Sequence, residues 1–156
     1  MTFRQLPDPR ERDWTRGRSD GIEEWSNYIH IIAINKGWWT GLIWGVELQE
    51  VSFDGNHTVT DTGDETVKIA IETYDGGESH RIDLDDPHQR AERNIPGRDV
   101  THLKFVPFLD PSGDLARHAE NAEEAEFVFE ATIQDNKRTD AVELLARMDV
   151  DDVEFN

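Results

Sequence analysis

The most regular feature of the chain is an alternation of apolar and polar residues, which is the pattern of strands that bury one face. It runs through 67–73 and 127–133, where Val, Ile, Phe or Ala recur at every second position. Clusters of Gly, Pro, Asp and Ser separate these stretches from their neighbours, as turns do. The strands predicted in this way are 67–73, 79–84, 101–109 and 127–133.

The apolar run 28–34 fits two structures. It could be a strand buried on both faces or a helix that ends at Gly37. We favour the strand, because isoleucine dominates the run and is β-branched. A turn at 35–37 then leads into a second strand, 38–48.

Three segments carry helix signals, namely 20–27, 114–123 and the segment that begins at Asp140. The first opens on a pattern similar to a capping box, and the second is rich in alanine. The third places Val142, Leu145 and Met148 on one helical face. These signals predict three short helices around the strands.

The elements together predict a mainly β fold, either a β-sandwich or a barrel, with two or three short peripheral α-helices. A chain of 156 residues has the length of one domain. We expect an extended basic N-terminal arm at 1–19 and a single acidic β-rich domain at 20–156. The tail 150–156 is suited to an edge strand.

Charge is the strongest compositional signal. The chain has 34 acidic residues against 16 basic ones, a net charge of −18, and its basic residues are 12 Arg and only 4 Lys. This composition resembles that of proteins from haloarchaea and their viruses, in which salt screens the repulsion among surface carboxylates. It implies a virion, or the cytoplasm of a salt-in halophile, as the location. The same acidity argues against nucleic acid as a partner.

The first residues differ from the rest in charge. Residues 1–18 contain five Arg against three acidic residues, and Pro7 and Pro9 disfavour a helix there. We expect this arm to bind an acidic neighbouring subunit, and its removal to leave a folded domain. The contact residues predicted in the arm are Phe3, Leu6, Arg10 and Trp14.

All five tryptophans lie within the first 44 residues. The pair Trp38 and Trp39 would point to opposite faces of a strand, so we expect at least one indole ring outside the core. Ordinary core packing explains some of these rings. A subunit interface, for which Trp is favoured, or a platform for stacking sugars explains an exposed one.

The best metal candidate is the loop 54–65, which has oxygen-bearing residues spaced as in a calcium loop: Asp54, Asn56, Thr58 and Glu65. Val59 stands where the sharp turn of that motif requires Gly, and strands rather than helices flank the loop. An acidic hairpin explains the same residues, so we expect no metal and no cofactor. His30 lies in an apolar strand, and we expect it to be a hydrogen-bonded core residue.

No nucleophile elbow, phosphate loop, dinucleotide fingerprint or zinc spacing occurs in the sequence, and there is no cysteine. The prediction is therefore a structural, non-catalytic subunit of a homo-oligomeric assembly at high salt. A tailed-virus virion protein (head–tail connector, tail tube or capsid decoration) fits that description, with itself and neighbouring structural proteins as partners and no membrane. The alternatives are a β-sandwich module that binds carbohydrate, and an unrecognised small enzyme or accessory protein of a halophile.

Overall fold

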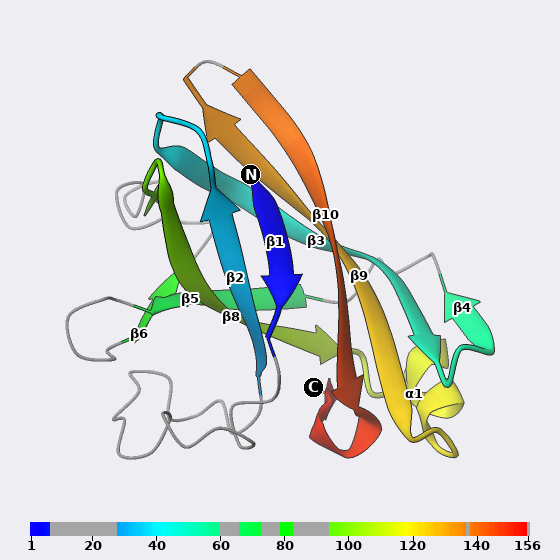
Figure 1. Ribbon diagram of the computed structural model, residues 1–156. Helices are drawn as coiled ribbons and strands as arrows, with labels where there is room; N and C mark the ends of the chain where they lie inside the picture. The colour runs from blue at the N-terminus through cyan, green and yellow to red at the C-terminus, as the bar shows by residue number, and fades with distance from the viewer. Residues whose placement is uncertain (7–27, 60–65, 73–78, 83–93, 137, 156) are drawn as a thin grey trace.

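The computed structural model describes residues 1–6, 28–59, 66–72, 79–82, 94–136 and 138–155. Within these ranges the chain is mainly β, with two sheets and one α-helix (Figure 1). The elements in chain order are β1 (Thr2–Gln5), β2 (Ile29–Asn35), β3 (Gly41–Phe53), β4 (His57–Val59), β5 (Thr66–Glu72), β6 (Ser79–Ile82), β7 (Asn94–Ile95), β8 (Asp99–Leu109), α1 (Asp114–Ala119), β9 (Glu124–Asp135), β10 (Arg138–Asp149), a 3-10 helix (Val150–Asp152) and β11 (Glu154–Phe155).

The first sheet has the strand order β1-β2-β8-β5-β6, and β11 adds a short parallel pairing to β8. The second sheet has the order β10-β9-β3-β4, and β7 pairs with β3. Every pairing except β11 with β8 is antiparallel. Neither order closes on itself among the strands described, so no closed barrel forms there.

Both sheets contribute to one hydrophobic core. Ile29 and Ile31 enter it from β2, and Phe127 and Phe129 enter it from β9. An edge-to-face contact between Phe105 of β8 and Phe129 joins the two sheets across the core, with ring centres 5.5 Å apart. Alternating side chains therefore bury one face of each sheet, as the period of two predicts.

The sequence predictions for most strands are confirmed. The Ile-rich run forms β2 and not a helix, and the described residues of the predicted strands 67–73, 79–84, 101–109 and 127–133 fall on β5, β6, β8 and β9. The second strand begins later than predicted, at Gly41, so Trp38 and Trp39 lie in the connection before it. The described part of the predicted edge strand, residues 150–155, contributes the 3-10 helix and the two-residue strand β11.

The helix predictions are confirmed only in part. Helix α1 confirms the Ala-rich segment, although it ends at Ala119, and the helix predicted at 20–27 lies outside the described residues. The helix predicted from Asp140 is wrong, because this segment forms β10, all of whose residues pair with β9. Its inward side is a period-two row that includes Leu144 and Ala146, and pairing with β9 overrides the helical propensity of its Ala, Leu, Glu and Arg residues.

The first residues of the predicted arm form a strand of the chain's own first sheet. β1 pairs with β2, and Phe3 is 6% exposed within the common core. The rest of the arm, from residue 7, lies outside the described residues. Among the helices that the structure describes, none is long and apolar enough to cross a membrane.

Candidate interaction surface

Two chain crossovers meet at one end of the molecule. Residues 36–40 lead from β2 in the first sheet to β3 in the second, and residues 96–98 lead from β7 in the second sheet to β8 in the first. Asn35 pairs with Asp99 at the end of β2, and Gly41 pairs with Ile95 at the start of β3. The two connections therefore lie side by side, although about 60 residues separate them.

The side chain of Asn35 fixes both crossovers. Its Nδ2 donates to the carbonyl oxygens of Trp39 at 2.9 Å and Ile95 at 3.3 Å, and its Oδ1 accepts from the Gly37 amide at 3.1 Å. The residue is 3% exposed, so these bonds satisfy a buried amide that would otherwise destabilise the fold. The turn that carries the two tryptophans is thus tied to the body of the protein at its backbone.

Arg98 and Gly97 complete this arrangement. The Arg98 amide donates to the Gly37 carbonyl at 2.8 Å, its Nη1 donates to the Lys36 carbonyl at 3.1 Å, and its guanidinium lies 4.4 Å from the centre of the Trp38 ring. Arg98 has a φ of 57°, a left-handed conformation that costs of order 1 kcal/mol for a residue with a side chain. A Cβ at Gly97 would lie 2.4 Å from the Trp38 carbonyl oxygen, so only glycine fits there.

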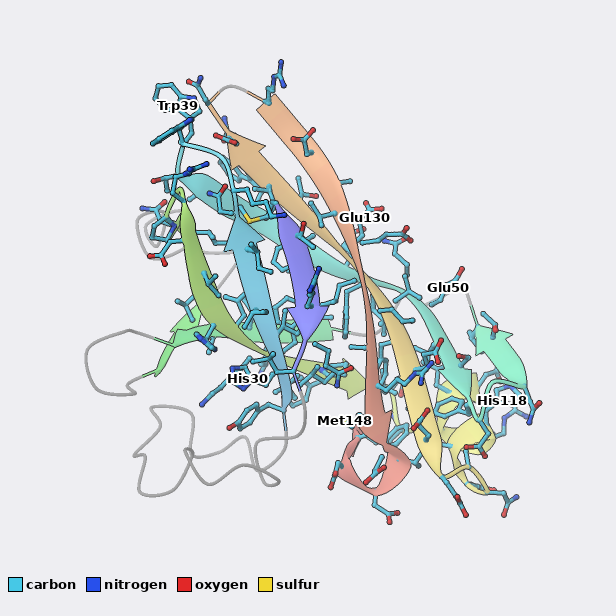
Figure 2. All side chains as sticks on the ribbon, in the orientation of Figure 1. His30, Trp39, Glu50, His118, Glu130 and Met148 are labelled. Carbon is cyan, nitrogen blue, oxygen red and sulfur yellow. The ribbon has the colours of Figure 1, made fainter. Side chains whose placement is uncertain are left out.

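This rigid corner presents large aromatic side chains to solvent. Trp38 is 79% exposed and Trp39 is 60% exposed. Trp39 is labelled in Figure 2. The prediction that at least one of these rings lies outside the core is therefore confirmed for both. We refer to residues 36–40 as the tryptophan turn.

A third exposed indole lies nearby on β3. Trp44 is 44% exposed and sits where the register of β3 against β9 shifts, between Ile43 and Gly45, as an extra residue in a β-bulge does. Its indole N–H donates to the side-chain oxygen of Gln134 on β9. The bulge therefore turns this ring outward from a strand whose other large apolar side chains are buried.

The remaining residues predicted for an interface are placed differently from one another. Phe3 belongs to the core of its own chain, and Leu6 is half-buried with its amide bonded to the His30 carbonyl at 2.8 Å. Arg10 and Trp14 lie outside the described residues. Of the six, the structure brings Trp38 and Trp39 together on the surface. The Trp doublet is the sequence signal that identifies these two residues. No sequence signal identifies the residues that hold them in place, Asn35, Gly97 and Arg98.

The calcium-like loop contains a tight hairpin turn between β3 and β4. Asp54 and Gly55 have φ values of 52° and 73°, and tight hairpin turns often require such positive φ values. The Asp54 carboxylate accepts hydrogen bonds from the backbone amides of Glu123 at 3.1 Å and Glu124 at 3.0 Å. Asn56 and Thr58 are exposed, and Glu65 lies outside the described residues. Asp54 thus anchors the start of β9, and among the residues described no three His, Cys, Asp or Glu side chains are grouped to hold a metal ion.

A buried polar cluster lies on the first sheet, on the side away from the common core. The Nε2 atom of His30 lies 3.0 Å from the Nδ1 atom of His102, so one ring nitrogen carries the proton that the other accepts. Lys104 is 2% exposed, and its Nζ lies 4.5 Å from the centre of the Tyr28 ring. His30, labelled in Figure 2, is 2% exposed, so its predicted burial and hydrogen bonding are confirmed, although it lies on the other side of the sheet from the common core.

Comparison with known proteins adds little to this geometry. The chain matches no protein-family model and no curated protein. One similar solved structure is a family 123 glycoside hydrolase from Clostridium perfringens, described in connection with glycolipid glycan hydrolysis. The similarity covers 77% of this chain and 20% of the hydrolase, at 8% identity and a TM-score of 0.29.

Proposed function

We propose that this chain is a structural, non-catalytic subunit of a homo-oligomeric assembly, and that the tryptophan turn is a contact with a neighbouring subunit. The observation that carries the proposal is the exposure of Trp38 and Trp39, 79% and 60%, on a corner whose backbone is fixed by a buried asparagine. Tryptophan is among the residues most enriched at the energetic centres of protein interfaces.

The rigidity of the corner supports a role in binding. A side chain on a mobile loop must be ordered when it binds, which costs about 0.5–1.5 kcal/mol for each immobilised side chain as well as the backbone term. The bonds from Asn35 and Arg98 order the backbone of the tryptophan turn before any partner arrives. Burying one such ring in a partner is then worth roughly 1.5–3 kcal/mol, as for other large apolar side chains.

Composition supports the environment of the proposed assembly. A net charge of −18 with few lysines suits a protein surface in molar salt, where the Debye screening length is about 3 Å and repulsion between more distant charges is weak. We place the assembly in a halophilic setting, as a virion component of a haloarchaeal tailed virus, built on a two-sheet β-sandwich. The finding of terminase or portal genes beside the gene would support the viral part, and a cluster of metabolic genes would contradict it.

A carbohydrate-binding module is the second candidate, because the same exposed indoles offer flat apolar faces to a sugar ring. Arg98 covers part of the Trp38 ring, and Trp39 and Trp44 provide two further exposed rings. This candidate differs from the first in its partner and not in its surface. It predicts a monomer whose tryptophan fluorescence changes on addition of an oligosaccharide.

One experiment separates the two candidates. Sedimentation velocity in molar salt should show the wild-type chain as an oligomer, and Trp38→Ala and Trp39→Ala should shift it toward monomer. Trp38→Tyr is the matched control, since it keeps a large aromatic ring and should retain most of the association. Both tryptophans are exposed, so thermal melts of the variants should match the wild type when all are diluted to monomer, where association adds no stability. A wild-type monomer that binds oligosaccharide would favour the second candidate. A wild-type monomer that binds no oligosaccharide would refute both.

A further inference from the structure

The start of β10 is an open sheet edge. β10 is the terminal strand of the second sheet and pairs with β9 without a register shift from Arg138 to Asp149. Its later part is flanked by β1, where the Gln5 side chain binds the Arg147 backbone. Figure 1 shows the start of β10 and the β9–β10 hairpin reaching past β1 to one end of the molecule.

The bonds to Gln5 also show in which direction the backbone groups of β10 point. The Arg147 N–H and C=O point away from β9, toward Gln5. Successive residues of an antiparallel strand alternate in this respect, so Thr139 and Ala141 also direct their N–H and C=O groups away from β9. Both residues are exposed, and among the described strands only β9 pairs with β10.

Several of the usual protections against pairing with another chain are absent from this edge. Natural edge strands are commonly short, bulged, interrupted by Pro, or lined with charged side chains, especially Lys. β10 has 12 residues, contains neither Pro nor Lys, and has no bulge against β9, and its open start carries charges of both signs, Arg138 and Asp140. The edge strands β1, β4 and β6 have 4, 3 and 4 residues.

The charges at this edge are self-complementary. Arg138, Thr139 and Asp140 are consecutive and exposed, and neither charged residue forms an ion pair with the described residues. If two copies pair antiparallel with a two-fold axis at Thr139, Arg138 of each copy lies opposite Asp140 of the other. Thr139 then lies opposite itself, and opposite charges directly across a strand pair are stabilising. Moving the axis to Asp140 would place two carboxylates opposite each other, which is unfavourable.

We propose that the edge at Arg138–Asp140 pairs antiparallel with the same edge of a second copy, which joins two second sheets into one continuous sheet. This inference rests on the proposed assembly function and specifies its partner and geometry. The tryptophan turn is close to the same edge, because Arg138 pairs with Asp135 and Asp135 pairs with Gly41, the residue after the turn. Strand pairing and aromatic contacts thus form one surface.

Charge reversal tests the pairing directly. Arg138→Asp places acid opposite acid in the paired edge, and Asp140→Arg places arginine opposite arginine, so each variant should self-associate about tenfold more weakly than the wild type or worse. The double variant Arg138→Asp/Asp140→Arg restores opposite charges and should recover association. A mixture of the two single variants should form a heterodimer, because each then supplies the charge that the other lacks. These residues are exposed, so the melting temperatures should change little when all variants are diluted to monomer, where association adds no stability.

A cysteine probe gives an independent readout, since the chain has no cysteine of its own. Thr139→Cys brings two thiols together across the axis at a Cα separation of about 5.5 Å, which suits a disulfide. Mild oxidation should give a covalent dimer, whereas Asn56→Cys, in the exposed turn before β4, should not. If the wild type is oligomeric and loses association with Trp38→Ala but tolerates both charge reversals, the strand pairing is wrong and the assembly proposal stands. A monomeric wild type refutes both.

Discussion

The side-chain amide of Gln5 is hydrogen-bonded at both ends to the backbone of Arg147. Its Nε2 donates to the Arg147 carbonyl at 2.7 Å, and its Oε1 accepts from the Arg147 amide at 2.7 Å. The glutamine therefore takes the place of a neighbouring strand and links edge strand β1 of the first sheet to edge strand β10 of the second.

We expect Gln5→Ala to lower the free energy of unfolding by about 1–3 kcal/mol, the value of two hydrogen bonds and the exposure of their backbone partners. Gln5→Glu should destabilise at least as much, because a carboxylate cannot donate to the Arg147 carbonyl. Urea denaturation at fixed salt measures both. Gln49→Ala is the control and should be near neutral, since among the described residues the Gln49 side-chain amide bonds only to the exposed Glu47 side chain. Equal stability of all three variants would contradict the role of Gln5.

The same link changes what is expected from removing residues 1–18. The sequence alone predicts a dispensable arm, but the deletion also removes β1, Phe3 and Gln5. Loss of a buried Phe side chain alone costs about 3–5 kcal/mol. We therefore expect this truncated chain to be unstable, and a test of residues 7–18 must keep residues 1–6.

Local patterns predict the strands well where period and composition agree. β2 and β9 combine β-branched or aromatic residues with strand periodicity, so both signals favour the correct structure. β10 carries strong helix formers, and the spacing of Val142, Leu145 and Met148 makes a helical face available. Pairing of β10 with β9 decides the structure there, and this long-range contact is not encoded in the segment itself.

The candidate surface is only partly predictable for a similar reason. The Trp38-Trp39 doublet predicts that a ring leaves the core, because neighbouring residues of a strand point to opposite faces. The structure places both rings outside the core for another reason, since they lie in the turn before β3. The contacts of Asn35 and Arg98 join crossovers about 60 residues apart, and they exist only once both sheets are assembled. The bulge that turns Trp44 outward likewise depends on the register of β3 against β9.

Three glutamates in register across the second sheet predict a local salt dependence. Glu130 of β9 lies opposite both Glu47 of β3 and Glu143 of β10, on the outer side of the sheet (Figure 2). Like charges directly across a strand pair are destabilising, by about 0.2–1 kcal/mol for each pair. Glu130→Gln should therefore raise the melting temperature at low salt, and the gain should vanish at molar salt.

Glu126→Gln is the matched control for this prediction. Glu126 lies on the same strand and faces Arg147, whose Nε is 3.1 Å from its Oε2. Its neutralisation should leave stability unchanged or lower it slightly at low salt. The wild-type melting temperature should itself rise with salt. A wild-type curve that is flat from low to molar salt would argue against adaptation to salt as a whole.

Gly97→Ala should disrupt the corner that holds the tryptophans. The added Cβ would meet the Trp38 carbonyl carbon and oxygen at 2.6 and 2.4 Å, and these are backbone atoms that cannot turn aside. We expect the free energy of unfolding to fall by more than about 1 kcal/mol, as is usual when an added group clashes with well-packed atoms, and the tryptophan fluorescence spectrum to change.

Gly45→Ala in β3 is the control and should be neutral or slightly stabilising, because its added Cβ would meet no non-neighbouring atom of the described residues within 4 Å. Unchanged fluorescence in Gly97→Ala would show that the corner is not built as described.

Asp54 provides the last test, because the sequence and the structure give its carboxylate different roles. As a calcium ligand, it would make the protein more stable with calcium than with a chelator. In the structure, the carboxylate accepts hydrogen bonds from the Glu123 and Glu124 amides, and the backbone amide of Asp54 donates to the Glu124 carbonyl at 3.0 Å.

Asp54→Ala should then lower the free energy of unfolding by about 1–3 kcal/mol, since two backbone donors lose their acceptor and φ remains positive. Asp54→Asn keeps a side-chain oxygen and tolerates the left-handed conformation, so it should retain most of the stability. The melting temperature of the wild type and of each variant should be the same with calcium as with a chelator. A calcium-dependent rise in the wild-type melting temperature that Asp54→Asn abolishes would support the calcium site instead.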